Sequence, residues 1–175
     1  METVRLVIRP FQEKDWVALF DYLSNPAVYR FEPGEPITAA EAKDLALERS
    51  QGNDFLAVAL KSSDKMIGHL YFSQVDPPEW MTWELGYIFN PAFQRQGYAT
   101  EASAALVRYA FEKLDAHRIV AHCNPENVAS WRVMEKIGMR REGLMLKSVF
   151  FRRDAGGAPL WMDAFEYAML REDLK

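Results

Sequence analysis

The sequence has little cysteine, no long apolar run and no excess of basic charge. Cys123 is the one cysteine in 175 residues, so no disulfide can form within the chain, which fits a reducing compartment. Charged residues interrupt each apolar stretch before it reaches the roughly 18 residues of a membrane span. Residues 1–10 alternate arginine with apolar residues and do not resemble a signal peptide. We therefore expect a cytoplasmic protein without a membrane segment.

The charge balance argues against nucleic acid as a ligand. The chain has 21 Lys and Arg against 25 Asp and Glu, a formal net charge of −4 at pH 7, whereas nucleic-acid-binding domains usually carry a basic excess. Apolar residues make up 49% and charged residues 26% of the chain, which is typical of folded proteins. This length suits one domain, so we expect residues 1–175 to form a single domain that binds no nucleic acid.

The histidines and the cysteine do not indicate a metal site or a cysteine nucleophile. His69, His117 and His122 lack metal-ligand spacing with cysteine or acidic residues. Cys123 lies in an apolar strand pattern, where a thiol is usually an inert part of the core. We expect no metal.

Hydrophobic periodicity predicts an alternation of strands and helices. Strands are predicted at residues 3–9, 55–60, 66–73, 81–89, 118–123, 142–151 and 160–170, and helices at 13–24, from Thr38 to about Gly52, after Gly97, and at 127–137. The unit from Glu84 to Cys123 is strand–helix–strand, which places two parallel strands beside an antiparallel meander. We therefore expect an α+β fold with a mixed sheet that splays between the fourth and fifth strands.

One connection has the features of an anion-binding loop. Residues 83–89 are the last part of the predicted fourth strand, and Gln94-Arg95-Gln96-Gly97 lead into the next helix. Backbone amides at a helix start have no intrahelical partner, and the helix dipole adds positive potential, so a phosphate is stabilised there. The residues alone also fit an ordinary strand-to-helix turn with a glycine, because the spacing matches neither GxxxxGK[ST] nor GxGxxG.

Four short motifs between residues 84 and 143 resemble a known family. They are Gln94, Gly97 and Ala99 in the form Q/R-x-x-G-x-G/A, the strand Glu84-Leu85-Gly86-Tyr87, the run Asn127-Val128-Ala129-Ser130, and the segment from Glu135 through Gly138 to Gly143. In these motifs the chain resembles the GCN5-related N-acetyltransferases (GNAT), and within them the RimJ/RimL-type ribosomal-protein N-acetyltransferases. The predicted element order agrees outside the motifs, so the resemblance extends over essentially the whole chain.

The resemblance implies a mostly antiparallel sheet with helices on both faces, and an enzyme that uses acetyl-CoA as co-substrate. A primary amine would attack the thioester directly in a ternary complex, without a covalent enzyme intermediate. Backbone amides of Arg95 to Ala99 would hold the CoA pyrophosphate, and amides near Tyr87 to Phe89 would bind the thioester carbonyl and the pantetheine arm. The implied cofactor-binding residues are Tyr87, Ile88, Phe89, Gln94, Arg95, Gln96, Gly97, Tyr98, Ala99, Thr100 and Asn127.

Two side chains are catalytic candidates. Glu84 could accept the amine's proton, or it could simply pair with a lysine or arginine across the strands. Met134 stands where many relatives carry a tyrosine acid, so the resemblance assigns to Ser130 a hydrogen bond to the departing thiolate. Both Ser130 and Asn127 also fit residues that merely start a helix, Asn127 as its cap.

The sequence leaves the acceptor amine open. An α-amine with a pKa of about 7.7–8.0 needs only a weak base, whereas a lysine with a pKa near 10.4 is costly to deprotonate. Glu32, Glu35 and Glu79 suit a cationic acceptor. A protein N-terminus of the ribosomal-protein type is the expected acceptor; the alternatives are a small amine such as a polyamine or aminoglycoside, or a non-catalytic acyl-CoA-binding module. A homodimer is neither indicated nor excluded.

Overall fold

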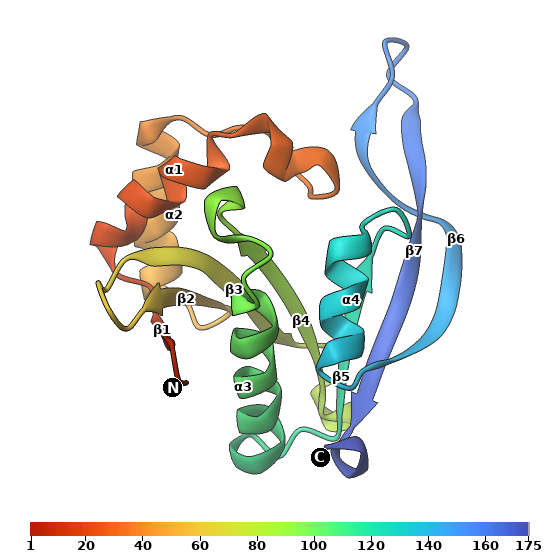
Figure 1. Ribbon diagram of the computed structural model, residues 1–175. Coiled ribbons are helices and arrows are strands. Elements are labelled where there is room, and N and C mark those ends of the chain that lie inside the picture. The colour runs from red at the N-terminus through yellow and green to blue at the C-terminus, as the bar shows by residue number, and fades with distance from the viewer. Residues whose placement is uncertain (175) are drawn as a thin grey trace.

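The computed structural model describes residues 1–174 and is built on one seven-stranded sheet (Figure 1). Its strands lie in the order β1-β2-β3-β4-β5-β7-β6, and every neighbouring pair is antiparallel except β4 and β5. The elements are β1 (Leu6–Pro10), α1 (Trp16–Leu23), α2 (Ala39–Gln51), β2 (Phe55–Leu60), β3 (Met66–Gln74), β4 (Thr82–Phe89), α3 (Tyr98–Lys113), β5 (Arg118–Cys123), α4 (Val128–Lys136), β6 (Arg140–Arg153) and β7 (Pro159–Leu170).

Helices cover both faces of the sheet, as the resemblance implied. Strand residues alternate between the faces, so in β4 Leu85 packs in one core with Leu106 of α3 and Met134 of α4, while Ile88 packs against a second core that contains Tyr22 of α1 and Ala46 of α2. No helix within residues 1–174 combines the length and the apolar composition needed to cross a membrane.

The parallel strands β4 and β5 are paired at one end only. Their register joins Thr82 to Arg118, Trp83 to Ile119 and Glu84 to Val120, and no pair follows Glu84. Strand β4 nevertheless continues to pair with β3 as far as Phe89. The two strands therefore separate beyond Glu84, and the splay predicted from the strand–helix–strand unit is confirmed (Figure 1).

The first strand is shorter than the sequence predicts. It begins at Leu6 instead of residue 3, because the chain turns back at Thr3, whose N–H donates to the carbonyl of Leu6 over 2.9 Å, and Glu2 bridges to Val7. Val4, which extends the apolar alternation in the sequence, is 92% exposed. Alternation alone did not distinguish this turn from a strand.

The C-terminal hairpin is longer than predicted. Strand β6 begins at Arg140 instead of residue 142 and ends at Arg153 instead of 151, and its turn projects beyond the body of the sheet (Figure 1). The register between β6 and β7 shifts between Met145 and Val149. These irregularities disturb the apolar alternation from which the strand ends were read.

Candidate active site

The splay opens into a cavity of about 770 Å³. Its walls come from the segment between α1 and α2, the end of β4, the loop before α3, and the first turns of α4. The residues named from the sequence that line it are Tyr87, Ile88, Phe89, Gln94, Arg95, Gly97, Tyr98, Ala99, Thr100, Asn127 and Ser130. Gln96 and Glu84 are not among its lining residues.

The loop before α3 presents a row of free backbone donors to this cavity. Gly97 caps α3 with a φ of 83°, in the left-handed region that glycine adopts without strain. The first helical bond runs from the N–H of Glu101 to the carbonyl of Gly97 over 3.0 Å. The N–H groups of residues 95–100 therefore have no protein partner within the described chain, and such a row at a helix start binds an anionic group.

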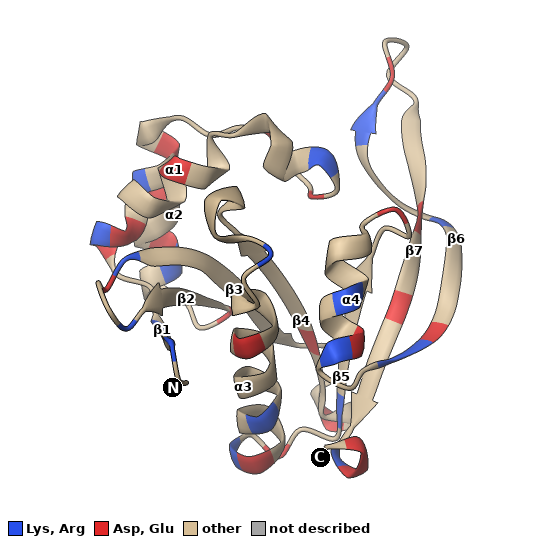
Figure 2. Ribbon diagram, in the orientation of Figure 1, with Lys and Arg blue, Asp and Glu red and all other residues tan. Residues whose placement is uncertain are grey.

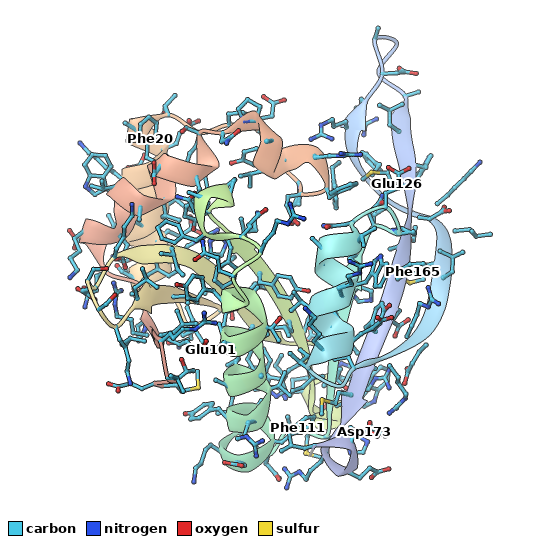
Figure 3. All side chains as sticks on the ribbon, in the orientation of Figure 1. Phe20, Glu101, Phe111, Glu126, Phe165 and Asp173 are labelled. Atoms are coloured by element: carbon cyan, nitrogen blue, oxygen red, sulfur yellow. The ribbon has the colours of Figure 1, made fainter. Side chains whose placement is uncertain are left out.

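Arg5 of the N-terminal segment braces this loop from outside. Its Nη1 donates to the carbonyl of Gln96 over 3.0 Å, and its guanidinium lies 4.4 Å from the ring centre of Tyr98. Its Nε donates over 2.7 Å to Glu101, which lies in the first turn of α3 (Figure 3). Burial alone would raise the pKa of Glu101, but hydrogen bonds from Thr3 and Arg5 outweigh it and lower that pKa. The sequence gave no signal for this contact, because Arg5 and Glu101 are 96 residues apart.

The end of β4 directs two backbone amides into the splay. Val75 donates to the carbonyl of Thr82 and Asn90 donates to the carbonyl of Ile67, so the even-numbered residues of β4 bond towards β3. Because successive residues of a strand point their backbone groups to opposite sides, the N–H groups of Tyr87 and Phe89 face the splay. Ile88 contributes a side chain to the cavity wall and bonds through its backbone towards β3.

Tyr87 and Ser130 form a polar pair inside the cavity. The Tyr87 hydroxyl donates to the carbonyl of Ser130 over 2.8 Å and lies 3.1 Å from the Ser130 Oγ. Burial raises the pKa of Tyr87, so its hydroxyl stays protonated at neutral pH. Asn127 accepts the N–H of Ser130 over 3.2 Å, which is the helix-cap arrangement, while it also lines the cavity. The sequence did not reveal that Tyr87 reaches Ser130, because the two residues lie on separate elements.

Two other side chains near Ser130, those of Cys123 and Met134, are poorly suited to donate a proton or to act as a nucleophile. Cys123 is 8% exposed, and its burial raises the pKa of the thiol to about 11, so it stays protonated at neutral pH. Met134 is 1% exposed and belongs to the core. Neither side chain competes with Tyr87 and Ser130 as a hydrogen-bond donor to a thiolate.

Glu84 lies at the closed end of the splay. Its Oε1 is 2.8 Å from Nδ1 of His122 on β5, and both side chains are 36% exposed. The hydrogen bond that His122 donates to the Glu84 carboxylate raises the pKa of His122, which favours an ion pair. The cross-strand partner of Glu84 is thus a histidine and not the lysine or arginine considered from the sequence. Its assignment as the base remains a prediction.

The charged residues that line the cavity are mostly basic. Arg95, Arg132 and Lys136 line it near the loop and α4, and Arg30 lines it in the segment between α1 and α2. Glu32, in that same segment, is the one acidic residue among its described lining residues. Figure 2 shows basic residues on α4, and a basic segment beside an acidic one at the end of the α1–α2 connection. Burial raises the pKa of Glu32 to about 7. The sequence suggested Glu32 only as one of several acidic residues.

Comparisons with known proteins agree with this geometry. A family model described as an acetyltransferase (GNAT) domain matches residues 5–140. The uncharacterized N-acetyltransferase YnaD of Bacillus subtilis (strain 168) is 40% identical over 172 residues, which cover 98% of this chain and 96% of that protein. The [ribosomal protein uS5]-alanine N-acetyltransferase of Escherichia coli (strain K12) is 27% identical over 154 residues, covering 82% of this chain and 79% of that protein.

A solved structure shows the same architecture. The crystal structure of a GNAT-family acetyltransferase from Bacillus anthracis superimposes with a TM-score of 0.89 at 35% identity, and the match covers 98% of each chain. The family model covers residues 5–140 and the structural match covers 98% of the chain. The chain therefore belongs to the GNAT acetyltransferase family and is an N-acetyltransferase.

Proposed function

We propose that this enzyme holds acetyl-CoA in the splay and transfers the acetyl group to a protein N-terminal α-amine. The observation that carries the cofactor placement is the row of free N–H groups at residues 95–100, because every residue of this row except Gln96 lines the same cavity as Tyr87 and Ser130. The pyrophosphate is bound by this row. The basic side chains of Arg95, Arg132 and Lys136 add positive potential on the same side.

The reacting end of acetyl-CoA then lies between the strands. The N–H groups of Tyr87 and Phe89 donate to the thioester carbonyl and the pantetheine arm, and these fixed donors stabilise negative charge as it develops on the carbonyl oxygen. The amine attacks the thioester directly, and the Ser130 hydroxyl, held by Tyr87, donates to the departing thiolate. This thiolate has a pKa near that of cysteine, about 8.5, so a hydrogen bond is sufficient help.

A site with a serine as hydrogen-bond donor and no tyrosine acid favours an α-amine as acceptor. Met134 cannot supply the proton that a tyrosine would, and an α-amine with a pKa of about 7.7–8.0 is partly neutral at physiological pH. The relative from Escherichia coli that is named for alanine acetylation of a ribosomal protein supports the same class. The acidic wall at Glu32 favours a second candidate, a small cationic amine such as a polyamine or aminoglycoside.

A thiol-release assay with a panel of amines tests the proposal. We expect saturable CoA release with peptides whose free N-terminus begins with a small residue, and little release with the same peptides blocked at the N-terminus. Release with polyamines or aminoglycosides but not with peptides would move the acceptor to the small-molecule class. Tight acetyl-CoA binding without release from any amine would contradict the assigned acceptors altogether.

A further inference from the structure

Glu32 occupies an unusual position for a surface-loop carboxylate. It follows the short helix Pro26–Arg30 and lines the cavity together with Tyr87 and Ser130. Its carboxylate has no hydrogen bond or ion pair with any residue in the described range 1–174. Glu32 is half-buried, and a carboxylate that loses part of its water shell without gaining a partner costs stability when it is charged. Its position at this cavity calls for a functional explanation.

The charged groups around Glu32 do not form ion pairs with its carboxylate. Burial is the main cause that raises the pKa of Tyr87 on β4 and of Cys123 on β5, and the negative charge of Glu32 adds to the effect at both. Glu32 therefore lies within electrostatic reach of the Tyr87–Ser130 pair. The cations nearby have other partners: Arg30 lies over the ring of Phe31 and 4.0 Å from Glu126, and Arg152 of β6 donates to the carbonyl of Tyr29. Across the cavity the charged lining groups are Arg95 of the loop and Arg132 and Lys136 of α4.

Glu84, the base expected from the sequence, is in a different situation. It is outside the cavity lining and already bound to His122 over 2.8 Å. The carboxylate of Glu84 therefore already has a partner on the neighbouring strand, whereas no described residue pairs with that of Glu32. Of the two carboxylates, Glu32 is the one that the cavity leaves free to meet an entering amine.

We propose that Glu32 is the catalytic residue that accepts the proton of the attacking amine. The proposal rests on the acetyl transfer proposed above and adds the identity of the base. The acceptor enters as an ammonium ion and gives one proton to the Glu32 carboxylate. The nitrogen lone pair then forms the C–N bond as the C–S bond breaks, the second proton passes from nitrogen to the CoA thiolate, and Glu32 returns its proton to solvent.

The environment of Glu32 suits this task. Burial raises the pKa of Glu32 to about 7, and a general base is most effective when its pKa lies near the operating pH. An α-ammonium has a pKa of about 7.7–8.0, so the proton transfer to Glu32 is close to balanced. A carboxylate with an ordinary pKa would be a much weaker base towards the same group.

Kinetics of Glu32→Gln over pH 6 to 9 test the proposal. With an N-terminal peptide we expect kcat/KM to fall by about 10–100-fold near pH 7, and we expect the deficit to shrink at high pH, where the amine is neutral without help. Glu32→Asp, which keeps a carboxylate, should recover part of the activity. Affinity for CoA should be unchanged in both variants. Asp44→Asn, which removes an exposed carboxylate of α2, is the control and should follow the wild-type profile.

Three results would overturn the assignment. An equal deficit at every pH would make Glu32 a group that holds the acceptor. A wild-type profile in Glu32→Gln, with the pH-dependent loss found in Glu84→Gln instead, would return the role to Glu84. A carboxyl-carbon NMR titration, assigned by comparison with Glu32→Gln, that gave Glu32 an ordinary carboxyl pKa would also contradict the proposal. This titration needs no substrate, so it tests the raised pKa on which the role of Glu32 depends even if the panel of amines shows that the proposed acceptor class is wrong.

Discussion

At the scale of single residues, burying the charge of Glu32 lowers the folding stability, and this cost can be measured as a function of pH. Burial raises its pKa from 4.5 in the unfolded chain to about 7, so the folded state binds this proton more tightly than the unfolded state does. The contribution of Glu32 to folding stability is therefore full below about pH 4.5 and is lost as the pH rises through 7.

The first prediction is that Glu32→Gln stabilises the protein at alkaline pH only. At pH 8 we expect a gain of about 1–2 kcal/mol, after allowance for partial solvent screening, which for a protein of this size raises Tm by about 2–4 °C per kcal/mol. At pH 4.5 the two proteins should melt together. Thermal unfolding of both proteins over this range provides the measurement, and a gain that did not change with pH would show that Glu32 is not buried as a charge.

A second prediction at this scale concerns Ser130. Ser130→Ala removes the hydroxyl that lies 3.1 Å from Tyr87, and we expect turnover to fall by about 10–100-fold, evenly from pH 6 to pH 9. The loss should be even because the serine hydroxyl does not titrate in this range. CoA affinity should persist, since the serine amide remains free to bond Asn127. Wild-type turnover in this variant would leave Tyr87 as the donor to the thiolate.

At the scale of elements, the proposed anion site consists of the loop before α3 and the first turn of that helix. Gly97 adopts a φ of 83°, and a Cβ there would meet Arg5 at 3.4 Å. We predict that Gly97→Asp weakens CoA binding at least about tenfold, because the carboxylate stands where the pyrophosphate binds. Gly157→Asp is the matched control, since Gly157 has a φ of 84° in the distant hairpin turn with open space around it. Calorimetry should show unchanged CoA affinity for the control only.

The hydrogen bonds of Arg5 with the loop and with Glu101 lead to a separate prediction for the same element. Arg5→Leu removes the bonds to Gln96 and Glu101 and lets the loop move, so we expect CoA affinity to fall about 3–10-fold and amide exchange at residues 95–100 to become faster. Lys14→Leu breaks an exposed ion pair with Asp64 far from this loop and should change neither quantity. Unaltered exchange in Arg5→Leu would show that the loop holds its shape without Arg5.

At the scale of the whole molecule, the distribution of charge and the acid and base groups of the cavity lead to a prediction about the acceptor amine. We predict that a peptide beginning with a small residue is acetylated on its terminus in preference to an internal lysine by at least about tenfold, because lysine is costlier to deprotonate. With a basic peptide, the rate should fall as salt is added, since acidic residues such as Glu32 attract it. Mass spectrometry of a peptide that carries both groups checks the preference, and acetylation mainly on lysine would contradict it.

The sequence by itself determined the order of the elements, the strand–helix–strand unit that makes β4 and β5 parallel and lets them separate, and the glycine loop at Gly97. These features depend on local periodicity and on the conformational freedom of one residue, which neighbouring residues encode. It did not reveal the turn at Thr3, because an exposed Val4 extends the alternation there. A resemblance in short motifs added the family, which the comparisons confirmed.

Only the tertiary structure decided how the side chains of the site are paired. The sheet places Glu84 beside His122, α4 places Ser130 against Tyr87, and the N-terminal segment places Arg5 against the loop. The tertiary structure also distinguishes Glu32 from the other acidic residues, because among the described residues it is the acidic one that lines the cavity. These contacts join residues far apart in the chain, and the pKa of each group depends on the burial and partners that folding supplies.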